Sequence, residues 1–109
     1  MGAVPDALSV YMTAPSRDLA EKIARTLVEE KLAACVNIIP GMRSIYRWKG
    51  KVEAANEVVL IAKTRADCFA ALEKRAKQLH PFECPCIVAW PIAAGHQPYL
   101  DWIAETTAS

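Results

Sequence analysis

Glycine and histidine are both scarce in this chain of 109 residues, which contains four of the first and two of the second. The few glycines form no G-x-G-x-x-G or G-x-x-x-x-G-K pattern, which excludes the glycine-rich loops that bind phosphate groups. No serine or cysteine stands in a G-x-S-x-G turn, and the second histidine has no fixed relation to the first. Because no nucleophile–base pair is indicated, we expect a non-catalytic protein.

An excess of positive charge is also absent. Lysine and arginine total 13 and aspartate and glutamate total 12, so the formal net charge is +1. A broad nucleic-acid-binding surface needs clustered basic residues, and we therefore expect no nucleic-acid partner. No apolar run approaches the roughly 20 residues that cross a bilayer, and the first residues lack the basic-then-apolar pattern of a signal peptide. The sequence thus predicts a cytoplasmic protein with no membrane partner.

The four cysteines are Cys35, Cys68, Cys84 and Cys86, and they form no paired C-x-x-C pattern of a zinc or redox site. In the cytoplasm we expect reduced thiols, and free cysteine behaves mainly as a small buried hydrophobe. Cys84 and Cys86 are two apart, so their side chains would share one face of a strand. Such a pair could bind a soft ion such as Cu(I), but one pair is a weak signal and packing is the favoured interpretation.

The first half of the chain alternates between strand and helix patterns. Leu8–Thr13 predicts a strand. Ser16 is a good N-cap for the following helix, whose apolar positions recur every three to five residues up to Leu32. Next come the extended segments Cys35–Ile39 and Ser44–Trp48, which Pro40-Gly41 separates.

Lys49-Gly50 predicts a turn that leads into the strongly β-prone segment Glu57–Thr64. Together these segments predict a long antiparallel hairpin, bulged near Pro40 or Asn56. Asp67 predicts the cap of a second helix, which His80-Pro81 ends because a residue before proline disfavours helical angles.

A last strand, Cys86–Trp90, and a short helix that begins at Pro98 complete the pattern. The order predicts an α+β, ferredoxin-like β-α-β-β-α-β sandwich with an extra C-terminal helix. We expect one domain over residues 1–109, with an ordered core at about residues 8–105. The sheet face without helices carries too many apolar residues for exposure to water, which predicts packing against partner chains.

Functional side chains gather in the segment Leu79–Pro91, LHPFECPCIVAWP. His80 ends a helix, where an imidazole can bond the last carbonyl groups, and Glu83 is close enough to share a pocket with it. We hypothesise a polar-aromatic pocket that also includes side chains from the hairpin and the strand after it. Its full set is Tyr46, Trp48, Lys63, His80 and Glu83.

Several stretches occur together in an order that is familiar from one family. They are EEKLAACVNIIPG, SIYRWKGKVE, EVVLIAKT, LHPFECP, PIAAG and YLDWI. In these stretches, from about Leu8 to Ile103, the chain resembles the CutA family of divalent-cation tolerance proteins. The resemblance implies a tight homotrimer, broadly like the PII signalling proteins, with lateral clefts between subunits near the five pocket residues.

The resemblance also implies a response to metal ions and the binding of copper or another divalent cation. The positions that match the family's ligands are His80, Glu83 and Cys35. Met12 stands where some members have a further cysteine, and methionine is a Cu(I) ligand. Leu79 stands where some members have a second histidine. The alternative is a PII-like signalling or scaffold trimer that binds a small anion or a partner protein in the clefts, and an enzyme using the same clefts is the least favoured idea.

Overall fold

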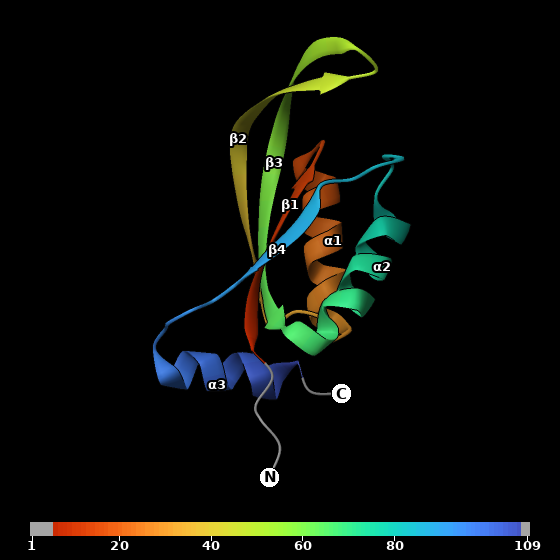
Figure 1. Ribbon diagram of the computed structural model, residues 1–109. Helices are drawn as coiled ribbons and strands as arrows, with labels where there is room; N and C mark the ends of the chain where they lie inside the picture. The colour runs from red at the N-terminus through yellow and green to blue at the C-terminus, as the bar shows by residue number, and fades with distance from the viewer. Residues whose placement is uncertain (1–5, 108–109) are drawn as a thin grey trace.

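The computed structural model describes residues 6–107, which form four strands and three α-helices. Figure 1 shows how they are arranged. The strands form one antiparallel sheet in the order β2-β3-β1-β4. The predicted α+β class and the order of the elements are confirmed. The elements are β1 (Ala7–Ala14), α1 (Arg17–Glu29), β2 (Cys35–Trp48), β3 (Lys51–Arg65), a 3₁₀ turn (Ala66–Cys68), α2 (Phe69–Leu79), β4 (Ile87–Pro91) and α3 (Gln97–Thr106).

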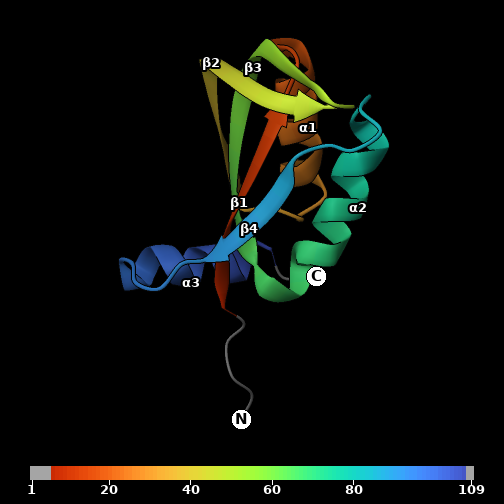
Figure 2. The ribbon, with the colours of Figure 1, turned by 45° about the horizontal axis from the view of Figure 1, so that its top comes forward.

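The helices α1 and α2 cover one face of the sheet (Figures 1 and 2). Alternate residues of β1 point to them, because successive side chains of a strand face opposite ways. Val10, Met12 and Ala14 are buried in this way against Ile23 and Leu27 of α1. The main hydrophobic cluster therefore lies between the sheet and these two helices.

The two helix starts differ in how well the sequence predicts them. The Ser16 hydroxyl accepts a hydrogen bond from the backbone N–H of Leu19 at 3.2 Å, so the first cap is confirmed. The prediction that Asp67 caps the second helix is wrong. Asp67 lies inside the 3₁₀ turn, where its carboxylate is 3.1 Å from Nε of Arg65, and Cys68 takes the cap position without a side-chain bond. The positive charge of the Arg65 guanidinium attracts the Asp67 carboxylate, which explains why Asp67 pairs with Arg65 and does not cap the helix.

The predicted hairpin is confirmed and is longer than the sequence suggests. β2 does not break at Pro40-Gly41, because Gly41 adopts a positive φ of 84° and lets the strand continue through a bulge. The pairing register with β3 shifts there, between Ile39 and Met42. Lys49 and Gly50 both have positive φ, as a tight two-residue turn requires. The hairpin projects beyond the body of the molecule, whose principal extents are 51 × 25 × 22 Å (Figure 1).

The other face of the sheet, opposite α1 and α2, is here called the open face. Its apolar side chains include Ile39, Val88 and Trp90, which are about half exposed, and Trp90 stacks on Tyr11 with ring centroids 6.1 Å apart. α3 lies across one end of the sheet (Figure 1) and buries Ile103 there. None of the helices in residues 6–107 has the length and apolar character needed to span a bilayer.

Candidate functional site

A cavity of about 800 Å³ lies at the base of the projecting hairpin. It forms because β1 ends at Ala14, whereas β2 and β3 continue past that end into the hairpin. The loop between α2 and β4 runs alongside the hairpin (Figure 2). Residues of the hairpin and of this loop line the cavity as its two walls. We call this cavity the groove. Its walls are residues of β2 from Met42 onwards, Glu57 of β3, the loop residues Pro81–Cys84 and Cys86, with Tyr11 and Thr13 of β1.

His80 ties the loop wall to the end of β1. Its Nδ1 accepts a hydrogen bond from the backbone N–H of Phe82 at 3.2 Å, so Nδ1 carries no proton. Nε2 therefore holds the ring proton and donates to the carbonyl oxygen of Thr13 at 2.9 Å. The His80 ring also packs on the Phe82 ring, with centroids 4.7 Å apart. Both ring nitrogens are thus engaged by the backbone, and His80 supports the groove without lining it.

Three of the five predicted pocket residues do meet in the groove. Tyr46 and Trp48 come from β2, and Glu83 comes from the loop on the other side. The side chains of all three are exposed. Two positively charged side chains, Arg43 and Lys49, also line the cavity. Lys49 Nζ lies 5.8 Å from the centre of the Trp48 ring.

Lys63 does not line the groove of its own chain. It is six residues from Glu57 along β3, which corresponds to about 20 Å. Its Nζ donates a hydrogen bond of 2.6 Å to Oδ1 of Asn37 on the open face. The hypothesis that placed Lys63 in one pocket with Tyr46 and Glu83 is therefore not met in one chain, because the strand carries it to the far end of the sheet.

The predicted metal ligands are not gathered by one chain either. Met12 is 3% exposed and packs in the core under α1, so its sulfur is not available. Cys35 Sγ lies 3.3 Å from the hydroxyl of Tyr99 at the opposite end of the sheet from the groove. This hydrogen bond, with burial and the charge of Cys35, raises the pKa of Tyr99 to about 12. Within the described range 6–107, no three His, Cys, Asp or Glu side chains are already arranged to hold a metal ion.

The groove also contains Met42 and Glu57, which the sequence did not single out, and Cys84 and Cys86, for which the favoured interpretation as packing residues is wrong because both thiols are exposed. Met42 and Glu57 are direct partners in the β2–β3 ladder, and both line the cavity. Cys84 and Cys86 line it from the loop. Burial, and then the charge of Glu57, raises the pKa of the Cys86 thiol. Regular alternation along β3 places Glu57 on this side, whereas Met42 reaches it only through the bulge in β2, whose register cannot be read from residue types alone.

Comparisons with known proteins give one consistent result. Residues 8–106 match the family model described as CutA1 divalent ion tolerance protein. The divalent-cation tolerance protein CutA of Thermus thermophilus is 53% identical over 98 residues, which are 90% of this chain and 95% of that protein. The solved structure of a Thermus thermophilus protein named divalent cation tolerance protein (Cut A1) superposes with a TM-score of 0.92 at 51% identity, covering 94% of this chain and 99% of that one.

A solved structure from Archaeoglobus fulgidus, named periplasmic divalent cation tolerance protein CutA, has a TM-score of 0.91 at 48% identity. It covers 94% of this chain and 99% of its own. Family model, sequence relatives and solved structures therefore agree over nearly the whole described chain. The chain belongs to the CutA1 divalent ion tolerance protein family, which is a non-catalytic family.

Proposed function

We propose that this divalent-cation tolerance protein is a homotrimer that binds copper or another divalent cation in the groove. The observation that carries the proposal is the groove itself, where Glu57 and Glu83 present carboxylates from two opposing walls. Carboxylate oxygens are common ligands of divalent cations. The aromatic side chains of Tyr46 and Trp48 would limit the access of water to a bound ion.

The open face supports self-association. Ile39, Val88 and Trp90 are 48%, 50% and 48% exposed on this face, and large apolar side chains left exposed on one sheet face favour an interface there. The edge strands β2 and β4 also leave backbone groups free to pair with another copy. A hairpin of one copy placed against the β4 edge of the next is a head-to-tail contact, which closes into a ring of three when successive copies are related by a 120° rotation. Three is the number of copies that the family resemblance implies.

In this trimer the groove lies at the border of the open face, and a neighbouring copy would complete it. We assign His80 the role of holding the Glu83 loop in place, because ligation by either His80 nitrogen would break a backbone hydrogen bond. Met12 has no part in this site, since it is buried in the core, and Cys35 does not reach the groove of its own chain, since it lies at the far end of the sheet. We further propose a cytoplasmic location, where the cysteines stay reduced.

Isothermal calorimetry with Cu(II) on the metal-free protein tests the proposed site. Glu83→Gln should weaken binding by about tenfold or more, because it removes a charged ligand and keeps the side-chain shape. Glu105→Gln is the matched control, since Glu105 is an exposed residue of α3 at the other end of the molecule. Equal affinities for the wild type and the two variants would refute a cation site at Glu83.

A second candidate is a PII-like signalling or scaffold trimer that binds a small anion. Arg43 and Lys49 favour it, because both line the groove. A thermal-shift screen of the metal-free protein separates the two functions. Stabilisation by an anionic metabolite and by no metal would support the anion function, and the reverse pattern would support cation binding.

A further inference from the structure

Two cysteines of the groove have no role in a carboxylate site. We propose that Cys84, Cys86 and Met42 form a separate sulfur site in the groove, which binds one Cu(I) ion per chain. The inference deepens the proposed cation function and rests on it for its biological meaning. The sulfur site uses different ligand atoms from the carboxylate site and binds copper in a different oxidation state. An experiment can therefore refute one site and leave the other standing.

The backbone presents the two thiols to the same side. Ile87 begins β4 opposite Met12 and packs against the core, so Cys86, one residue earlier, faces the open side. Cys84, two residues before Cys86, lies in a bend of the loop and lines the same groove as Cys86. Both cysteines are exposed, whereas Pro85 between them is half-buried. Proline fixes its own φ, so the backbone between the thiols is held while the two side chains remain free to rotate onto an ion.

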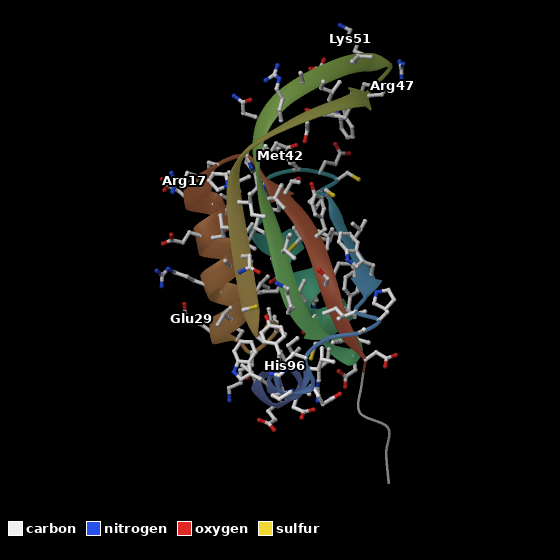
Figure 3. All side chains as sticks on the ribbon, turned by 90° about the vertical axis from the view of Figure 1, so that its left-hand side faces the viewer. Arg17, Glu29, Met42, Arg47, Lys51 and His96 are labelled. Atoms are coloured by element: carbon white, nitrogen blue, oxygen red, sulfur yellow. The ribbon has the colours of Figure 1, made fainter. Side chains whose placement is uncertain are left out.

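Met42 supplies the third sulfur because of the bulge in β2. The register shift between Ile39 and Met42 turns Met42 to the open side, whereas an unshifted strand would turn it toward the helices. Figure 3 shows Met42 where the hairpin leaves the body of the molecule. Its Sδ accepts a hydrogen bond from the Ser44 hydroxyl at 3.2 Å, which orients the thioether within the groove wall.

The donor set selects a soft ion. Thiolate and thioether sulfur favour Cu(I), whereas a structural zinc site needs four ligands. Within residues 6–107 no three His, Cys, Asp or Glu side chains are arranged to hold a metal ion. This disfavours a zinc site more than a Cu(I) site with sulfur ligands. Each thiol releases its proton to solvent on binding, and no electron is transferred because the metal enters as Cu(I). Arg43 and Lys49 line the same cavity together with Glu57 and Glu83, so the preference for Cu(I) rests on the sulfur donors and not on the net charge of the groove.

Competition with the chromophoric Cu(I) chelator bathocuproine disulfonate tests the proposal, under anaerobic conditions with the full chain. Wild type should withdraw one Cu(I) per chain. Cys84→Ser and Cys86→Ser should each lower the affinity about 100-fold or more, and Met42→Leu about tenfold. Cys68→Ser is the matched control, because the Cys68 thiol lies away from the groove, 3.6 Å from the carbonyl oxygen of Thr107.

The outcomes distinguish the sulfur site from the carboxylate site. A wild type that does not compete for Cu(I), or a Cys84→Ser/Cys86→Ser double variant that competes equally well, overturns the sulfur site. Cu(I) binding that survives Glu83→Gln and fails in the double variant supports two separate sites. Circular dichroism should show an unchanged fold for the double variant, because both replaced thiols are exposed and serine is nearly isosteric.

Discussion

Replacement of Trp90 by alanine should dissociate the proposed trimer. Trp90 is 48% exposed in the single chain. A tryptophan side chain can bury up to about 250 Å², so the exposed half amounts to about 120 Å². At about 25 cal/mol per Å², covering this area stabilises the trimer by about 3 kcal/mol per copy and about 9 kcal/mol per trimer. Since three chains associate, the concentration at which half the trimer dissociates should rise about a thousandfold.

Sedimentation velocity over a dilution series measures this change. Val28→Ala is the control, because Val28 is also exposed, at 39%, but lies on α1 away from the open face. The control should remain trimeric at concentrations where Trp90→Ala is monomeric, with circular dichroism showing both folded. A wild-type chain that is monomeric at micromolar concentration, or a Trp90→Ala trimer as stable as wild type, would refute the assignment of the open face as the interface.

Three further variants test local features. His80→Ala should lower the free energy of unfolding by about 1–3 kcal/mol in urea titrations, because it leaves the Thr13 carbonyl without its ring donor; an unchanged midpoint would contradict the tie between loop and β1. Gly50→Ala should cost about 1 kcal/mol in the same assay, since its φ of 80° disfavours a Cβ, and no loss would count against the tight turn. Cys35→Ala should lower the pKa of Tyr99 from about 12 toward 10, and an unmoved absorbance titration would rule out the Cys35 hydrogen bond as the main cause.

Much of the fold could be predicted because it depends on local patterns. The short, mostly apolar run Leu8–Thr13, the Ser16 cap and the Lys49-Gly50 turn each specify a short element by its own residues. The bulge near Pro40 was also predictable, because proline lacks the N–H that a regular ladder needs. The position of Asp67 was not, since its choice between capping a helix and pairing with Arg65 depends on the tertiary path of the chain.

The groove was predictable only in part. Glu83 stands out beside a helix-ending His80, and the aromatic pair Tyr46 and Trp48 stands out near a turn. The partnership of Met42 with Glu57 depends on a one-residue register shift, which residue types do not specify. His80 could be recognised as important, but its role as a support follows only from the two backbone groups that its ring nitrogens engage.

A crystal structure of the protein soaked with copper, with anomalous data at the copper edge, tests the central claim most directly. The account predicts a homotrimer with an anomalous peak in each groove, within ligand distance of Glu83 for Cu(II). Crystals soaked with Cu(I) under reducing conditions should place the peak beside Cys84 and Cys86. A trimer whose copper binds outside the groove, or an assembly that leaves the open face uncovered, would contradict it.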